Sequence, residues 1–177
     1  MSRFLLRSVL VVGVVAVVLG VVAASGDARA ENGSAFGGPW ISIEYPANPY
    51  DQASQGAFLL VNTYHHGTPM NYTVTGRAEG VIGGERRSMP LELRRTSRAG
   101  ASAVHKQWSD DGTWVLVLTT GQSRGSAATA VVEIGRDGAI ASVQVPTERV
   151  GAGVGRATRP VTDAEIDALL ARRVAAK

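Results

Sequence analysis

Residues 110–118 read Asp-Asp-Gly-Thr-Trp-Val-Leu-Val-Leu, and they are the clearest indication of the fold in the sequence. Its first three residues are typical of a tight turn, because Asp and Gly tolerate the backbone angles that turns require. Trp114–Leu118 follows as the most intensely apolar run outside the N-terminal segment. A short apolar run that begins at a turn is typical of a buried strand. The stretch therefore predicts the core strand of a β domain.

Shorter segments on both sides of this run predict further strands. Apolar and polar side chains alternate with a period of two in residues 41–45, 72–75 and 91–94, whereas residues 57–64 begin apolar on both faces. Residues 130–134 and 140–145 flank Gly135-Arg136-Asp137-Gly138, whose Asp-Gly pair is a strong hairpin signal. About seven short strands separated by turns predict a sandwich or barrel, and no βαβ pattern competes.

The C-terminus has a helical pattern instead. Thr162-Asp163-Ala164-Glu165 forms a capping box, and apolar residues then recur at helical spacing at Ile166, Leu169, Leu170 and Val174. This predicts one amphipathic helix over residues 162–177. Residues 148–161, with glycines at every second position of 151–155, predict a flexible linker. The pattern leaves open whether the helix docks on its own domain or on another molecule.

The first thirty residues carry an export signal. Arg3 and Arg7 precede the apolar run Val9–Ala24, and Ala28-Arg29-Ala30 matches an Ala-x-Ala cleavage site. Residues 1–30 are therefore predicted to be a signal peptide cleaved after Ala30, or a signal anchor that keeps residues 1–26 in the membrane. Both alternatives place the domain outside the cytoplasm. Residues 31–39, small and polar, predict a linker to the domain at 40–147.

Composition narrows the class of protein further. The chain has 177 residues, enough for one domain, and no cysteine, which excludes a disulfide scaffold, a thiolate metal site and a cysteine nucleophile. An exported domain without disulfides favours a bacterial periplasm. Residues 1–30 hold three arginines against one aspartate, so the rest carries 15 basic and 14 acidic residues. The basic pI of about 9.7 is thus no indication of nucleic-acid binding.

The region Gly56–Gly121 resembles the small exported immunoglobulin-like domains of bacteria. The resemblance rests on Phe58-Leu59-Leu60-Val61, on Leu91-x-Leu93, and on the pattern of a polar turn, Gly, x, Trp and alternating apolar residues within Trp108–Val117. It implies an immunoglobulin-like antiparallel β-sandwich, although the paired cysteines of antibody domains are absent. The chain also resembles accessory subunits on the outer face of bacterial membrane assemblies, including photosynthetic reaction-centre and light-harvesting complexes. This implies a non-enzymatic subunit that docks to and stabilises a membrane protein complex.

Five arginines and one tryptophan are the candidates for partner binding. The arginines cluster within thirteen residues, at Arg86, Arg87, Arg94, Arg95 and Arg98. They predict either a solvated edge that discourages strand-to-strand aggregation or a docking patch for an acidic partner or anionic lipid headgroups. Trp114 is expected in the core. Trp40, beside Pro39 and the linker, is expected at a membrane surface or in a groove of the partner.

His65-His66 suggests an alternative function, a periplasmic copper or small-ligand binding module. Met70, with Met89 and His105 also available, would complete a set of soft ligands. Neighbouring residues on a strand point to opposite faces, so both histidines can bind one ion only if the strand has ended. Gly67 and Pro69 permit such an end.

Catalytic patterns are weak, and we expect neither enzymatic activity nor a cofactor. No Gly-x-Ser-x-Gly motif occurs, and Gly121–Gly125 is interpreted as a connection. Glu44, Glu92 and Glu133 occupy polar positions of alternating strands and are expected to be solvated, which disfavours a glycosidase pair. Gly80–Gly84 lacks the Lys-Ser/Thr of a phosphate loop and predicts a turn. A small hydrolase would require a pocket with converging polar groups.

Overall fold

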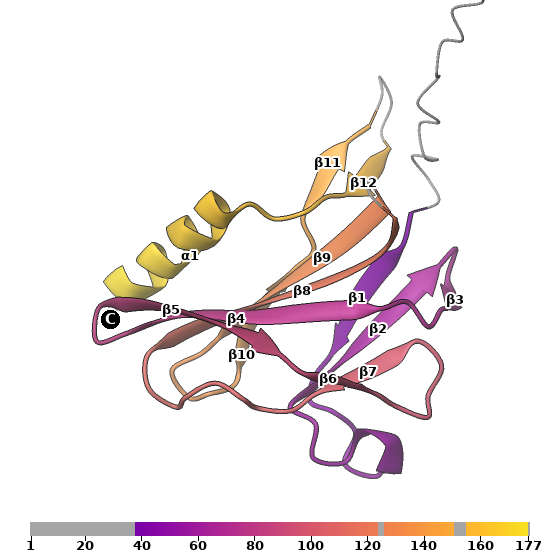
Figure 1. The fold of residues 1–177 in the computed structure, drawn as a ribbon, viewed down its shortest axis with the longest axis horizontal. Coiled ribbons are helices and arrows are strands. Elements are labelled where there is room, and N and C mark those ends of the chain that lie inside the picture. Colours follow the sequence, from indigo (N-terminus) through magenta and orange to yellow (C-terminus); the bar gives the residue numbers. More distant parts are fainter. Residues whose placement is uncertain (1–37, 124–125, 151–154, 177) are drawn as a thin grey trace, which may run out of the picture. The chain divides into compact units, whose positions relative to one another are not determined.

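The computed structural model describes residues 38–123, 126–150 and 155–176 (Figure 1). The expected signal segment 1–30 and most of the expected linker 31–39 lie outside these residues. No helix in the described ranges has the length and apolar character needed to span a membrane. The export signal therefore stays a prediction from the sequence.

The fold is mainly β, built from two antiparallel five-stranded sheets and one C-terminal helix. Sheet A contains β1 (Trp40–Glu44), β2 (Leu59–His65), β3 (Thr68–Pro69), β6 (Leu93–Arg95) and β7 (Ala101–Val104). Sheet B contains β4 (Val74–Ile82), β5 (Glu85–Leu91), β8 (Thr113–Ser123), β9 (Ser126–Ile134) and β10 (Ile140–Gln144). The order is β1-β2-β7-β6 in sheet A, where β3 pairs with β2, and β10-β9-β8-β4-β5 in sheet B. This arrangement is compatible with a β-sandwich.

Strand β8 is covered on both faces, which explains its unbroken apolar run. Trp114, Leu116 and Leu118 belong to a core cluster that includes residues of both sheets, among them Leu59 and Val104. Val115 and Val117 point the other way and pack with Val131 and with Ile166, Leu169 and Leu170 of the C-terminal helix. Successive side chains of a strand alternate between faces, so a strand between two apolar layers needs apolar residues at every position. The prediction of a core strand is confirmed.

A glycine makes room for the largest side chain of β8. The Trp114 indole lies against the backbone of β4 at Gly80, where an added Cβ would come within 2.4 Å of the indole Cε3. The Trp114 Nε1 donates a hydrogen bond to the Asp111 carbonyl at 2.8 Å, so its polar atom is satisfied although the side chain is buried. The predicted turn at 110–112 thus also positions the core tryptophan.

Helix α1 (Asp163–Ala175) docks on the outer face of sheet B, the face turned away from sheet A (Figure 1). The predicted capping box is present: the Thr162 side chain accepts from the Glu165 backbone N–H, and the Glu165 side chain accepts from the Thr162 backbone N–H. Near the other end of the helix, the Arg173 guanidinium donates to the Ile134 carbonyl at 2.6 Å. The question of where the helix docks is answered: it covers its own domain.

The predicted hairpin turn at Gly135–Gly138 is present, whereas the turn predicted at Gly80–Gly84 is confined to Gly83–Gly84 because residues 80–82 belong to β4. Gly83 and Gly84, both at positive φ, connect β4 to β5, and Gly138 closes the β9–β10 hairpin with a φ of 77°. Several elements were not predicted from the sequence, among them strands β5 and β7. The predicted linker also contains structure, because β11 (Thr147–Arg149) pairs with β12 (Arg156–Thr158). These strands lack a clear apolar alternation. A short 3-10 helix, η1 (Gln52–Ser54), lies in the loop between β1 and β2.

Candidate functional site

The five candidate arginines lie where the chain passes from one sheet to the other. Arg86 and Arg87 belong to β5, an edge strand of sheet B, and Arg94 and Arg95 belong to β6, an edge strand of sheet A. Arg98 lies in the turn that leads into β7. The cluster in the sequence is therefore spread over three environments, and each environment gives its arginines different partners.

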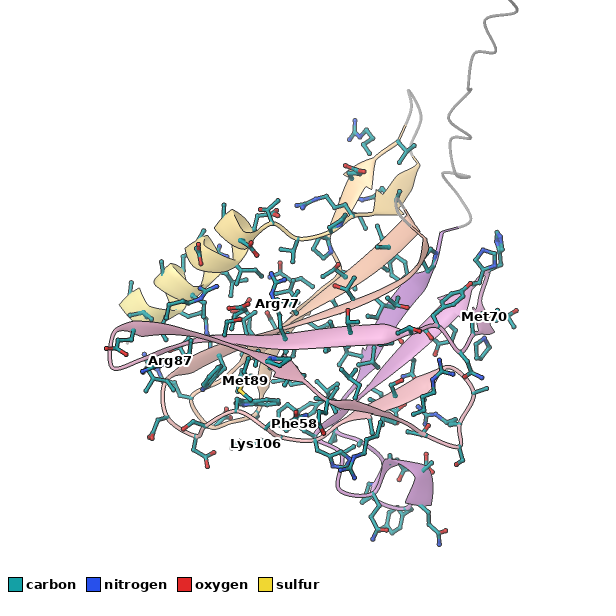
Figure 2. The ribbon with its side chains drawn as sticks, in the orientation of Figure 1. Phe58, Met70, Arg77, Arg87, Met89 and Lys106 are labelled. Atoms are coloured by element: carbon teal, nitrogen blue, oxygen red, sulfur yellow. The ribbon has the colours of Figure 1, made fainter. Side chains whose placement is uncertain are left out.

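Arg86 and Arg87 are both paired within the chain. They point to opposite faces of sheet B because they are neighbours on a strand. Arg86 lies on the face of α1, with its Nη2 3.1 Å from Glu79 Oε2 and its Nη1 2.7 Å from Asp167 Oδ1. Arg87 lies on the side of β5 away from α1 (Figure 2), with its Nη2 2.6 Å from Glu85 Oε2.

Glu79 is the centre of a charged cluster under α1 that we call the Glu79 network: Arg77, Glu79, Arg86, Asp163 and Asp167. The Glu79 side chain is only 7% exposed, and its Oε1 lies 2.8 Å from Arg77 Nε and accepts a 2.9 Å hydrogen bond from the Ser88 hydroxyl. Arg77 Nη2 reaches Asp163 Oδ1 at 2.7 Å. Two arginines thus neutralise one buried carboxylate and also bind two carboxylates of the helix. The sequence analysis did not identify Glu79.

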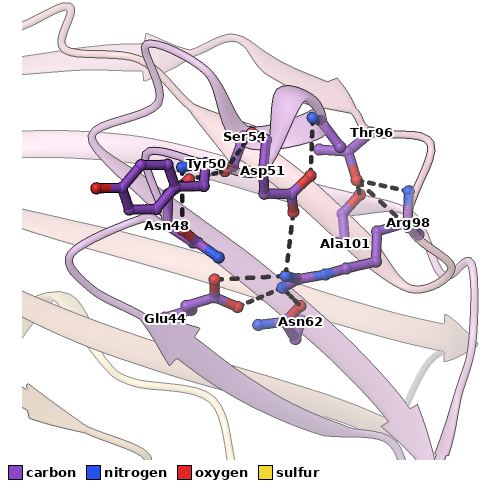
Figure 3. Close-up of polar contacts among 10 residues, drawn as sticks. Glu44, Asn48, Tyr50, Asp51, Ser54, Asn62, Thr96, Arg98 and Ala101 are labelled. Atoms are coloured by element: carbon purple, nitrogen blue, oxygen red, sulfur yellow. Dashed lines mark hydrogen bonds and ion pairs between the residues drawn. The ribbon is translucent and has the colours of Figure 1, made fainter.

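Arg98 holds together the outer face of sheet A (Figure 3). Its guanidinium pairs with the Glu44 carboxylate, donates to the Asn62 side-chain oxygen at 3.0 Å, and lies 3.5 Å from Asp51 Oδ2. The hydrogen bond from Arg98 lowers the pKa of Glu44, and the Glu44 carboxylate in turn raises the pKa of Arg98. Arg98 therefore connects β1, β2 and the loop that carries η1, and the carboxylates of Glu44 and Asp51 neutralise its charge.

Arg94 and Arg95 have the freest charges of the five. Strand β6 pairs only with β7 and is the last strand on its side of sheet A. Both side chains are exposed. Arg95 Nη2 donates to the Asn71 carbonyl at 3.2 Å, whereas the Arg94 side chain forms neither a hydrogen bond nor an ion pair with any residue that the structure describes. A carboxylate partner for these two residues would have to come from elsewhere.

The tryptophans divide between core and surface. Trp108 and Trp114 are both buried in the core, which confirms the prediction for Trp114. Trp40 is 47% exposed at the start of β1, opposite Tyr64 in the β1–β2 register. It follows the expected linker directly in sequence. An exposed indole at this position is available for a contact outside the domain.

The two neighbouring histidines meet the condition that a shared metal ion requires. Strand β2 ends at His65, and His66 has a φ of 49° in the turn to β3, so the two ring centroids come within 4.3 Å of each other. His105 is engaged elsewhere, through a 2.8 Å hydrogen bond between its Nδ1 and the Gly56 carbonyl. Figure 2 shows Met70 beside β3 and Met89 far from it, and Met89 packs against the core. No group of three or more histidines and carboxylates among the described residues is arranged to hold a metal.

Two of the three strand carboxylates are not solvated as expected. Glu133 has a side chain only 13% exposed; it accepts a 2.7 Å hydrogen bond from Ser142 and lies 3.7 Å from Arg173 Nε. Glu44 is paired with Arg98, and only Glu92 is exposed as predicted. The expectation was wrong for Glu44 and Glu133 because their arginine partners are distant in the sequence. These pairs are arginine–carboxylate contacts and give no support to a glycosidase pair.

A groove of about 580 Å³ runs along one side of α1. We call it the α1 groove. Its lining combines apolar side chains of sheet B and α1 with three arginines and one glutamate: Val131, Val145, Pro146, Val161, Ile166, Ala168 and Leu169, with Arg156, Arg159, Arg172 and Glu165; Gln144 and Thr147 complete it. The sequence analysis did not identify this groove, because its walls are formed by segments that only the fold brings together.

Comparisons with models of known families, with characterised proteins and with solved structures find no match to this chain. A function therefore has to be argued from the geometry of the residues themselves. Three features of the described chain could bind another molecule: the β6 arginines, which have no carboxylate partner within it, the adjacent histidines and the α1 groove.

Proposed function

We propose that this chain is a non-enzymatic, extracytoplasmic accessory subunit that docks on an acidic surface of a membrane-associated protein complex through strand β6. One observation carries the proposal: Arg94 is exposed on a free edge strand and has no partner among the described residues, whereas Arg86, Arg87 and Arg98 of the same cluster are paired. Arginine favours interfaces, because its planar guanidinium can pair with a carboxylate through two hydrogen bonds. The docking patch is thus narrowed to Arg94 and Arg95.

The order of the strands supports an immunoglobulin-like domain as part of this proposal. In immunoglobulin constant-type domains one sheet has the order A-B-E-D and the other contains C, F and G. Here β1-β2-β7-β6 corresponds to A-B-E-D, and β9-β8-β4 corresponds to G-F-C in the same chain order. A fold does not by itself imply a function, so this correspondence supports the architecture and not the partner.

The predicted export signal supports the extracytoplasmic location of the domain, and the exposed tryptophan supports a contact near the membrane or the partner. The N-terminal segment of the sequence predicts translocation, with the domain outside the cytoplasm in either outcome of cleavage. Trp40, 47% exposed next to the expected linker, suits a contact with the membrane interface or with the partner. In this proposal the complex supplies the acidic surface, which would explain why the described part of the chain provides no carboxylate at β6.

The double substitution Arg94→Glu, Arg95→Glu tests the docking patch. The full chain is recovered from gently solubilised membranes, and we expect its co-purifying partner to be lost because two attractive charges become repulsive. The free energy of unfolding should change by less than about 0.5 kcal/mol, since both residues are exposed. The matched control is Arg149→Glu, Arg172→Glu, which makes the same charge change on two exposed arginines remote from β6. Unchanged co-purification of the β6 variant would contradict the proposal.

A second candidate, copper binding, is favoured by the 4.3 Å approach of the His65 and His66 rings. Two imidazoles and the Met70 thioether form a ligand set that suits copper outside the cytoplasm. Titration of the full chain with Cu(I) and with Cu(II) tests it. Tight 1:1 binding that is lost in His65→Ala, His66→Ala and kept in His105→Ala would replace the docking proposal by a metal-binding one.

A further inference from the structure

The α1 groove lies on the part of sheet B that α1 leaves uncovered. Helix α1 contacts β8 and β4, while β9 and β10 continue the sheet beside it. The segment that leaves β10 and the strand β12 form the opposite wall (Figure 1). The α1 groove thus has sheet B as its floor, α1 on one side, and β12 with the segment after β10 on the other.

The floor of the α1 groove is apolar. Val131 of β9, Val161 before the helix, and Ile166 and Leu169 of α1 all line it, and all four belong to or pack against the cluster under the helix. Val145 lines it from the opposite wall. Val131, Ile166 and Leu169 are at most 6% exposed, so the apolar surface that is still open to water in the groove belongs to Val145, Pro146, Val161 and Ala168. Such surface gains free energy when a ligand displaces water from it, which suits the apolar part of a ligand.

The rim of the α1 groove carries an excess of positive charge. Arg159 is neutralised by Glu165, with Nη2–Oε1 at 2.5 Å and Nη1–Oε2 at 3.0 Å. This pairing and the hydrogen bonds from Thr162 lower the pKa of Glu165 to about 2, so Glu165 stays ionised and Arg159 stays occupied. The other two arginines have no such partner.

Arg156 and Arg172 are the two rim arginines whose charge is not neutralised by a carboxylate of the described chain. The Arg156 Nε donates to the Thr147 hydroxyl at 2.8 Å, a neutral partner. The Arg172 side chain is exposed and forms no hydrogen bond or ion pair within the described part of the chain. Two unneutralised guanidinium groups thus line one apolar trough, from its two opposite walls.

We propose that the α1 groove binds a single-chain amphiphile with a carboxylate head, of the size of a medium-chain fatty acid. Val145, Val161 and Ala168 would contact the apolar chain, and the positive charges of Arg156 and Arg172 would attract the carboxylate. The volume of about 580 Å³ falls in the usual range for small-molecule sites, roughly 300–1,000 Å³. The apolar floor disfavours a wholly polar anion, and the uncompensated rim charge disfavours a neutral lipid. The site is separate from β6 and does not depend on the docking proposal.

Titration with decanoate tests the inference. The full chain is used as recovered from cells, in phosphatidylcholine nanodiscs if residues 1–30 remain attached. We expect saturable 1:1 binding by calorimetry, together with shifts of the methyl resonances of Val131, Ile166 and Leu169. Arg156→Ala and Arg172→Ala should each weaken binding about tenfold, as expected for the loss of one charge-assisted hydrogen-bonding group. Decanol, with the same chain length and no charge, should bind more than about tenfold more weakly.

Matched variants separate filling of the groove from loss of charge. Ala168 is an exposed residue of α1 that lines the groove, and Ala171 is an exposed residue of the same helix that does not. Ala168→Trp should abolish decanoate binding, whereas Ala171→Trp and Arg94→Glu should leave it unchanged. Absent saturation, equal binding of decanol, or methyl shifts that occur only with phosphatidylglycerol nanodiscs would each overturn the inference. The last of these results would identify an anionic membrane surface as the ligand.

Discussion

The outer face of sheet B and the free edge of sheet A both carry arginines, but the fold supplies carboxylates only to the first. On sheet B, Arg77 and Arg86 share the buried Glu79 and reach Asp163 and Asp167 of α1. On the edge strand β6, Arg94 finds no carboxylate in the part of the chain that the structure describes. One residue type thus has two roles within a few residues of sequence.

The role of an arginine in this domain depends on what lies over it. An apolar helix face, Ile166, Leu169 and Leu170, covers sheet B, and the Glu79 network flanks this contact with matched charges. No strand of the described chain pairs with the outer edge of β6, where charge opposes unwanted strand addition and remains available to a partner. The covered face stabilises the domain, and the uncovered edge is the better candidate for binding.

The largest expected effect comes from the apolar part of the covered face. Leu170 of α1 is 1% exposed in the cluster with Val115 and Val117. Leu170→Ala should lower the free energy of unfolding by about 3 kcal/mol through lost burial and the cavity left behind. Denaturant unfolding of the full chain measures it. The control Val174→Ala, on the exposed side of the same helix, should cost less than about 1 kcal/mol. Equal losses would show that α1 contributes no packing on the sheet.

The charged part of the covered face should give the next largest effect. Glu79→Gln removes the buried carboxylate that two arginines share and leaves them only the exposed carboxylates of α1 as ion-pair partners. We expect a loss of about 2 kcal/mol, less than for a fully buried pair because both arginines are partly exposed. Glu92→Gln is the matched control on an exposed carboxylate between β5 and β6 and should change stability by less than about 0.5 kcal/mol. An unchanged free energy of unfolding in Glu79→Gln would show that the Glu79 network does not stabilise the domain.

The smallest effect concerns the cap of α1. Hydrogen bonds from Arg159 and Thr162 lower the pKa of Glu165 from 4.5 to about 2. Because the folded pKa is lower than the unfolded one, the stabilising contribution is complete above the unfolded value and is lost as the pH falls from about 4.5 toward 2. Carboxyl carbon NMR should show the midpoint near 2, and Arg159→Ala should raise it. A midpoint near 4.5 in the unaltered chain would contradict the pairing.

Local patterns predicted much of the fold. The strand at 114–118, the hairpin at Gly135–Gly138 and the capping box at Thr162 depend on neighbours within a few residues, so the sequence indicates them directly. Strands β5 and β7 were missed. Residues 85–91 are mostly polar on an edge strand, and residues 101–104 are small, so neither has the apolar alternation that marks a half-buried strand.

The candidate site was predicted less completely than the fold. The sequence identified the five arginines and Trp40 as candidates for partner binding, but it could not distinguish the paired arginines from the free ones. Their partners Glu79, Glu44 and Asp167 come close only through strand pairing and helix docking. Glu44 and Glu133 were expected to be solvated for the same reason. The α1 groove had no sequence signal, since its lining comes from β9, from the chain around β11 and β12, and from α1.

Hydrophobic period and turn chemistry are properties of neighbouring residues, so the amino-acid pattern was enough to predict a β domain with a capped C-terminal helix. Long-range contacts were needed to show that α1 covers sheet B and that Arg86 and Arg98 are neutralised while Arg94 has no carboxylate partner in the described chain. The same holds for the α1 groove, which opens beside the helix. Each of these outcomes depends on contacts between residues far apart in the chain. Their charges and surfaces meet only after the sheets have formed.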